Sequence, residues 1–135
     1  MIDGVSADFE PWPYPSPVLE QLGSFWLHRH DPLRIGFFVD DYKVNGRGFL
    51  HAGVIATIAD VVIGHTLAAT TEPPTPLVTI NLTCDYVGTA QAGAWIDGLI
   101  APIRVGRRLA SGTAMFTADN RTVATARGLY MPVTA

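Results

Sequence analysis

The chain of 135 residues is poor in charge, and it has neither a basic cluster nor a long apolar run. Charged residues make up only 16% of it, and a net charge of −3 without a basic run does not fit a nucleic-acid-binding surface. Its apolar stretches, such as residues 54–63, are interrupted by Thr57 and Asp60 and are too short to cross a bilayer. We therefore expect neither a nucleic-acid nor a membrane partner.

Cysteine is almost absent, since Cys84 stands alone and cannot form an intramolecular disulfide. The first four residues, Met1 to Gly4, lack the basic and apolar regions of a signal peptide, so we expect a cytoplasmic protein. His28, His30 and His65 have no cysteine or carboxylate partners at metal-ligand spacing, and no metal is expected. A serine nucleophile elbow and a phosphate-binding glycine loop are also missing, which argues against a serine hydrolase and a nucleotide-binding fold.

Apolar residues, in contrast, are abundant at 48% of the chain. This exceeds the usual share in a soluble domain of this size, and it predicts either a large core or an apolar surface that a partner covers. A second copy of the same chain is the commonest such partner. The length suits one domain, which we place at residues 24–135 behind an N-terminal arm of residues 1–23.

The order of elements predicts an α+β fold. Alternate prolines make the arm extended, with a helical turn over 17–22 that Gly23 ends. A hairpin of strands follows at 24–30 and 33–39, and then a long helix at about 51–69. Next comes a half-buried strand in which Val78, Ile80, Leu82, Cys84 and Tyr86 form the apolar row. A meander over 94–105, 109–117 and 122–131 completes an antiparallel sheet of about five to six strands around the helix.

Asp60 lies within the long helix, on the face opposite the apolar residues. At about 100° per residue it shares that face with small residues, namely Gly53, Ala56, Thr57 and Gly64, which leaves room for a substrate or a partner chain. The free N–H groups of Ala52 and Gly53 at the helix start can donate to a carbonyl oxygen. These residues alone also fit a solvated aspartate and an ordinary helix start.

The segment from His51 to Asp60, HAGVIATIAD, resembles the His-Gly-Gly helix start and following carboxylate of the PaaI-type hotdog thioesterases, named from phenylacetate degradation. The strand 78–82 and the segment 104–110, RVGRRLA, resemble the next landmarks of that family in the same order. The resemblance covers residues 40–131. One position departs from it, because Ala52 stands where the family usually has glycine.

The resemblance implies a single hotdog fold and hydrolysis of a small or medium acyl-CoA, aromatic ones included, with coenzyme A as part of the substrate and no separate cofactor. It implies a site in which Asp60 is the catalytic carboxylate, Ala52 and Gly53 after His51 form the oxyanion hole, and Asn45 and Thr79 complete the group. The carboxylate and the oxyanion hole would come from different subunits of a homodimer or homotetramer.

Substrate binding is assigned to Thr57 and to the turn Gly106-Arg107-Arg108, because guanidinium groups suit the phosphates of coenzyme A. Solvated turn arginines are an equally ordinary interpretation, and Asn45 also fits a turn before Gly46. The alternative function is a non-catalytic hotdog protein that binds acyl-CoA or an acyl carrier. Ala52 favours this alternative, because it replaces the glycine usual in the family. A hydratase is disfavoured because Asp60 has no histidine partner beside it.

Overall fold

The computed structural model describes residues 4–133, so the expectation drawn from Met1 to Gly4 lies mostly outside the described part. One antiparallel sheet holds all seven strands, in the order β1-β2-β3-β5-β6-β7-β4. The elements in chain order are β1 (Phe9–Pro11), α1 (Pro17–Leu22), β2 (Trp26–His28), β3 (Arg34–Phe38), α2 (Ala52–Ala68), β4 (Leu77–Tyr86), β5 (Trp95–Val105), β6 (Ala110–Ala118) and β7 (Arg121–Pro132).

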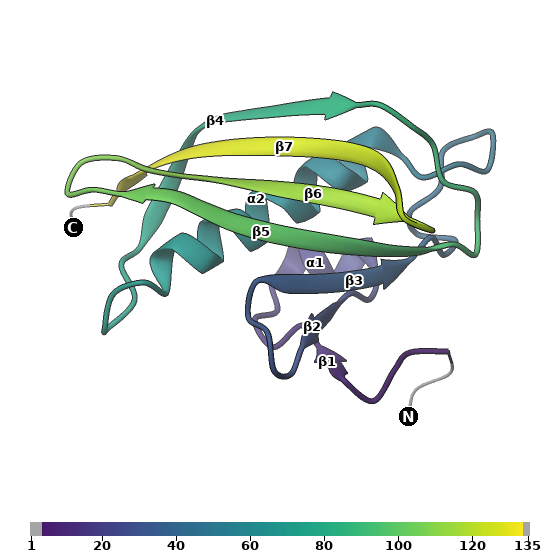
Figure 1. Ribbon diagram of the computed structural model, residues 1–135, viewed down its shortest axis with the longest axis horizontal. Coiled ribbons are helices and arrows are strands. Elements are labelled where there is room, and N and C mark those ends of the chain that lie inside the picture. Colours follow the sequence, from purple (N-terminus) through teal and green to yellow (C-terminus); the bar gives the residue numbers. More distant parts are fainter. Residues whose placement is uncertain (1–3, 134–135) are drawn as a thin grey trace.

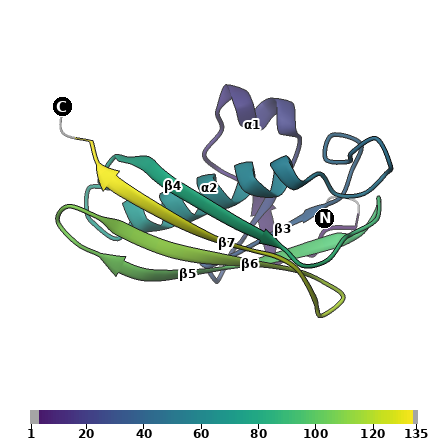
Figure 2. The same cartoon turned by 90° about the horizontal axis from the view of Figure 1, so that it is seen from above.

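The sheet curves around α2, which lies along one of its faces, and α1 lies beyond the helix on the same side (Figures 1 and 2). This confirms the expected hotdog arrangement of one long helix wrapped by an antiparallel sheet. Ile55, Ile58 and Val62 are at most 2% exposed and pack into the core, as their spacing predicts. The helix starts after His51, whose extended backbone (φ −73°, ψ 131°) makes it the N-cap.

The sheet has one strand more than expected because the arm contributes β1, which pairs with β2. The arm is extended as predicted, and the predicted turn is α1, which ends at Gly23 with a φ of +90°. Past β1, Trp12 and Tyr14 cross to the helix side, where the Tyr14 and His65 rings lie 3.8 Å apart. There the aromatic residues of the arm line a cavity of about 260 Å³ on the face of α2 opposite Asp60.

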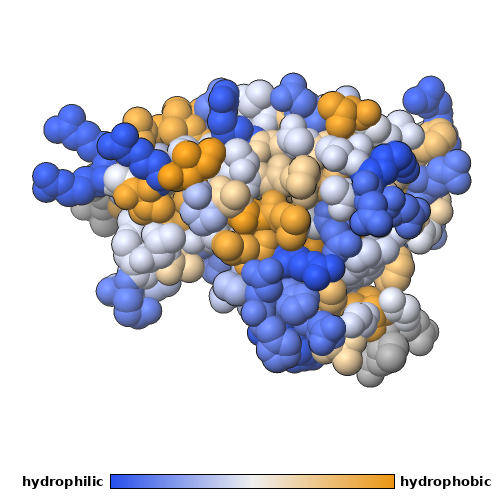
Figure 3. All heavy atoms as spheres, in the orientation of Figure 1, coloured by the Kyte–Doolittle hydropathy of each residue, from blue (hydrophilic) through white to orange (hydrophobic). Residues whose placement is uncertain are grey.

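The face of the sheet opposite α2 is only partly covered. Leu99 and Met115 are cross-strand partners on it and are 46% and 40% exposed. They line a shallow hollow of about 510 Å³, flanked by Asp85 and Arg127. Figure 3 views this face and shows apolar side chains gathered over its middle. Part of the apolar excess in the composition therefore lies on the surface.

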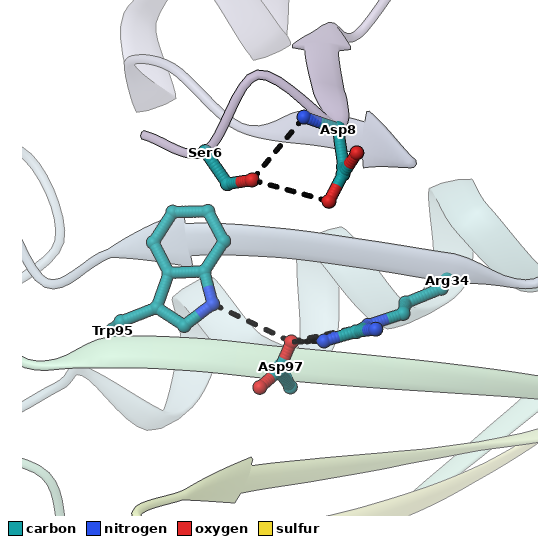
Figure 4. Close-up of polar contacts among 5 residues, drawn as sticks. All are labelled: Ser6, Asp8, Arg34, Trp95 and Asp97. Atoms are coloured by element: carbon teal, nitrogen blue, oxygen red, sulfur yellow. Dashed lines mark hydrogen bonds and ion pairs between the residues drawn. The ribbon is translucent and has the colours of Figure 1, made fainter. Parts of the chain in front are cut away.

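A second, small core closes the β1–β3 end of that face, where Val5, Phe9 and Trp26 pack with Phe38 and Trp95. Beside it, the Asp97 carboxylate accepts hydrogen bonds from Arg34 (3.0 Å) and Trp95 (3.4 Å), which ties β3 to β5 (Figure 4). In the same view Ser6 and Asp8 close a turn of the arm. The arm is thus held on both faces of the sheet.

Of the expected half-buried row on β4, only Leu82 and Cys84 are half-buried, and Tyr86 at the end of the row is 45% exposed. Val78 and Ile80 are 47% and 48% exposed, because a register shift between Thr79 and Asn81 reverses the alternation. Thr79 therefore shares the helix-facing side with Leu82 and Cys84. β4 is also an edge strand with β7 on one side only, which explains why so much of it is exposed.

In the described part of the chain, neither helix is long and apolar enough to cross a membrane. Residues 4–133 also contain no cluster of three or more His, Cys, Asp or Glu side chains able to hold a metal ion.

Candidate active site

Three elements converge on the Asp60 carboxylate. Thr79 of β4 and Tyr130 of β7 are cross-strand partners, and both side chains reach Asp60 on α2. The Thr79 hydroxyl donates to Asp60 Oδ1 over 2.7 Å, and the Tyr130 hydroxyl lies 3.1 Å from the same oxygen. No hydrogen bond to Oδ2 is made by residues 4–133. The strand order thus places two hydroxyl donors on one carboxylate oxygen and leaves the other free.

The space beside Gly64 is filled by the protein itself, which corrects the expectation of open room there. The Tyr130 ring occupies it, and a Cβ at Gly64 would lie 3.0 Å from Tyr130 Cε1. Ala56 and Thr57, toward the helix start, are partly exposed, and so is Gly64 itself. The Tyr130 ring therefore takes up space beside Asp60 on the Gly64 side.

Tyr130 is the contact of Asp60 that the sequence did not predict. Burial first, and then the negative charge of Asp60, raises the pKa of Tyr130 above its ordinary value of 10. The phenol therefore stays protonated and acts as a donor. The only sequence signal for it is Gly128, two residues earlier on the same strand, where a Cβ would lie 2.6 Å from the Tyr130 hydroxyl.

At the start of α2, one backbone N–H is hydrogen-bonded to a side chain and another is free. The Gly53 N–H donates to His51 Nδ1 over 2.8 Å, so the histidine side chain caps the helix. The Ala52 N–H has no acceptor within the described residues. Tyr86 of β4 donates to the Ala52 carbonyl over 2.8 Å, and burial, followed by the effects of Cys84, raises the pKa of Tyr86 to about 12. Of the two predicted oxyanion donors, Ala52 is the available one.

The loop before α2 is fixed by the buried Lys43, whose ammonium lies 2.9 Å from Asp40 Oδ2. The Lys43 carbonyl accepts from the His51 N–H over 2.8 Å, so this anchor also orients the helix start. Asn45 in the same loop uses its side-chain oxygen to accept from the N–H groups of Arg47 (2.9 Å) and Phe49 (3.2 Å). Asn45 is thus a turn residue here, with its NH₂ group left over for other contacts.

Thr57 lies one turn before Asp60, and its hydroxyl donates back to the Gly53 carbonyl over 2.9 Å. Its oxygen retains acceptor capacity toward a bound molecule.

The predicted phosphate-binding residues lie at the far end of the sheet, at the turn between β5 and β6. Gly106, Arg107 and Arg108 border a hollow of about 690 Å³ together with Arg104, which the sequence did not single out. None of these three arginines forms an ion pair with the described residues. The hollow is therefore a concave basic surface with guanidinium groups free to bind phosphate.

Asp60 and the free amide cannot act on one thioester within a single chain. Eight residues of α2 separate them, which is about 12 Å at 1.5 Å per residue. Reacting atoms must approach to about 3–3.5 Å, with the oxyanion donor close to the same carbonyl. One copy of the chain thus places the Asp60 carboxylate and the Ala52 N–H at separate points along the same helix.

Comparison with known proteins identifies the family. A family model described as the thioesterase superfamily matches residues 47–125. The chain belongs to the thioesterase superfamily. It is 34% identical over 129 residues to the Pseudomonas aeruginosa protein PA0474, whose name suggests an esterase, covering 93% of this chain and 96% of that one. Membership of the thioesterase superfamily supports thioester hydrolysis in general.

Solved structures of other proteins share the fold. The E. coli PaaI protein from the phenylacetic acid degradation operon matches with a TM-score of 0.68 at 17% identity, over 82% of this chain and 74% of that chain. The Bacillus halodurans protein BH2602, solved with CoA, matches with a TM-score of 0.69 at 18% identity, over 75% and 67%. The predicted resemblance to PaaI-type hotdog proteins is confirmed.

Proposed function

We propose that the protein hydrolyses acyl-CoA thioesters to a free acid and coenzyme A, with Asp60 as the catalytic carboxylate. The observation that carries this proposal is the Asp60 side chain, whose Oδ1 is held by two hydroxyls while Oδ2 makes no hydrogen bond within residues 4–133. A carboxylate held in this way presents the same oxygen in every turnover, either to accept a proton or to attack the substrate.

In the reaction, Oδ2 removes a proton from water, and the resulting hydroxide attacks the thioester carbon. The C–S bond then breaks, and the coenzyme A thiolate leaves and takes up the proton that Oδ2 removed from water. Direct attack by Oδ2 on the carbon is the other route, in which water would hydrolyse the resulting anhydride. In both routes the carbonyl oxygen gains negative charge and needs a hydrogen-bond donor.

That donor is the Ala52 N–H of a second copy, so the active form is a homodimer or a larger assembly. Two features support this proposal. The two halves of the site lie about 12 Å apart along one helix. Asp60 also lies beside the edge strand β4, where exposed Val78 and Ile80 and unpaired backbone groups suit pairing with another chain. A second copy joined at β4 would border the Asp60 carboxylate.

Coenzyme A is the proposed leaving group because of the three arginines Arg104, Arg107 and Arg108 around one hollow. The fold relative from Bacillus halodurans that was solved with CoA supports the same substrate class. Neutralising Arg107 and Arg108 together is expected to raise KM for an acyl-CoA by about tenfold and to leave KM for the matching N-acetylcysteamine thioester, which lacks the phosphates, unchanged. Equal changes for both substrates would refute the phosphate contact.

The central test is a thiol-release assay over short, medium and aromatic acyl-CoAs. Asp60→Ala is expected to lower kcat by about a hundredfold or more. The matched control is Asp41→Ala, an exposed loop carboxylate, which is expected to leave kcat unchanged. Equal rates for wild type and Asp60→Ala would remove Asp60 from the mechanism. Binding of a non-hydrolysable thioether analogue without turnover of any thioester would instead support the non-catalytic binding protein.

A further inference from the structure

Tyr130 contacts Asp60 at two places, through its side chain and through its main chain. The phenol oxygen lies 3.1 Å from Asp60 Oδ1 and 3.0 Å from the Asp60 carbonyl oxygen. A phenol carries one proton, so this is a shared hydrogen bond between two acceptors of the same residue. Because both acceptors belong to Asp60, the contact restricts the side chain relative to its own backbone.

We propose that Tyr130 is a positioning residue that, together with Thr79, locks the Asp60 carboxylate through Oδ1 and reserves Oδ2 for the reaction. This inference rests on the proposed thioesterase function and adds a residue to it. Thr79 approaches the same oxygen from the neighbouring strand at 2.7 Å. Two donors on one oxygen fix the rotation of the carboxyl plane, which a single donor does not do.

The position of Tyr130 is itself tightly constrained. The residue is 2% exposed, and its ring lies between α2 and its own strand, where glycine makes room on both sides. A Cβ would lie 3.0 Å from the ring at Gly64 and 2.6 Å from the hydroxyl at Gly128. The ring is therefore packed closely against both glycines, and a phenylalanine in its place would keep the packing and lose only the hydroxyl.

The hydroxyl also remains a donor throughout the neutral range, since burial raises the pKa of Tyr130 above its ordinary value. The phenolate form is therefore disfavoured at neutral pH, and the hydroxyl serves as a hydrogen-bond donor to Asp60.

The test compares kcat and KM of Tyr130→Phe with wild type, in the thiol-release assay and at equal folded content. We expect kcat to fall about tenfold or more, as for loss of a hydrogen bond to a charged group, with KM unchanged within about twofold. Tyr42→Phe is the matched control, because Tyr42 is 70% exposed and its hydroxyl makes no hydrogen bond within residues 4–133. A second variant, Gly64→Ala, keeps the hydroxyl but displaces the ring, and it should lower kcat in the same way.

A merely structural role is distinguished by repeating Tyr130→Phe in the Asp60→Ala background. If Tyr130 acts through Asp60, the residual rate changes less than about twofold there. The same fold-loss in both backgrounds, or a Tyr130→Phe variant as fast as an active wild type, would overturn the proposal for Tyr130 alone. A wild type that releases thiol from no thioester would instead refute the proposed function, and the positioning role with it.

Discussion

The sharpest prediction concerns Ala52→Pro at the start of α2. Proline has no N–H, so the substitution deletes the proposed oxyanion donor. The backbone at position 52 can accept proline for two reasons. Ala52 is the first residue of the helix, where proline is favoured, and His51 before it has the extended backbone (φ −73°, ψ 131°) that a following proline requires. The Ala52 N–H also has no acceptor among residues 4–133, so no internal hydrogen bond is lost.

The expected loss follows from the role of one such donor. Removing one oxyanion-hole hydrogen bond costs about 3 kcal/mol in the transition state, which is a fall in kcat of about a hundredfold or more. Ala52→Gly retains the N–H and is the matched control, with kcat expected within a few-fold of wild type. Both variants are assayed by thiol release, and their thermal unfolding is compared. A well-folded Ala52→Pro enzyme with wild-type kcat would refute the assignment of this amide.

The same variant tests whether the site is shared between subunits. In a co-expressed mixture of Ala52→Pro and Asp60→Ala chains, half of the randomly paired dimers are mixed, and each mixed dimer contains one intact site. Activity should therefore return to about one quarter of the wild-type level. Mixed preparations no more active than the separate variants would contradict a site built from two copies.

Further predictions concern stability. Gly36→Ala would drive its methyl group into the Trp95 indole ring and should lower the free energy of unfolding by about 1–3 kcal/mol in urea titrations, whereas Gly46→Ala, with open space around it, should be near neutral. Burial lowers the pKa of His65 below 6.5, so its contribution to stability is present above about pH 6.5 and is lost at lower pH; His65→Gln should weaken that dependence, and an unchanged acid slope would contradict it. The raised pKa of Tyr86, about 12, means that stability falls as pH rises from 10 toward 12, and Tyr86→Phe should reduce this loss in alkaline melts.

Much of the fold could be predicted because its signals are local. The buried residues of α2 recur at helical spacing, and the strands of the meander are separated by short turns, so the predicted bounds agree with the structure to within a few residues. The seventh strand was missed for the opposite reason. β1 is a proline-bounded segment of three residues whose strand character comes only from pairing with β2.

The candidate site also has a part that local sequence predicts and a part that depends on contacts between distant segments. Asp60 and the helix start were predicted from their positions on one helix, but the two hydroxyls that hold Asp60 depend on neighbouring strands. Thr79 faces the helix because of a register shift that the alternating pattern of β4 conceals. Tyr130 was missed because it is 70 residues from Asp60 along the chain, and a buried tyrosine on a core strand has no sequence pattern of its own.

The sequence by itself determined the long helix, the carboxylate on its less apolar face and the free amide at its start, because helical periodicity and capping act over a few neighbouring residues. Only the tertiary structure decided which carboxylate oxygen is held, which side chain fills the space beside Gly64, and which strand is left with an open edge. These depend on strand order and register, which come from packing between segments far apart in the chain.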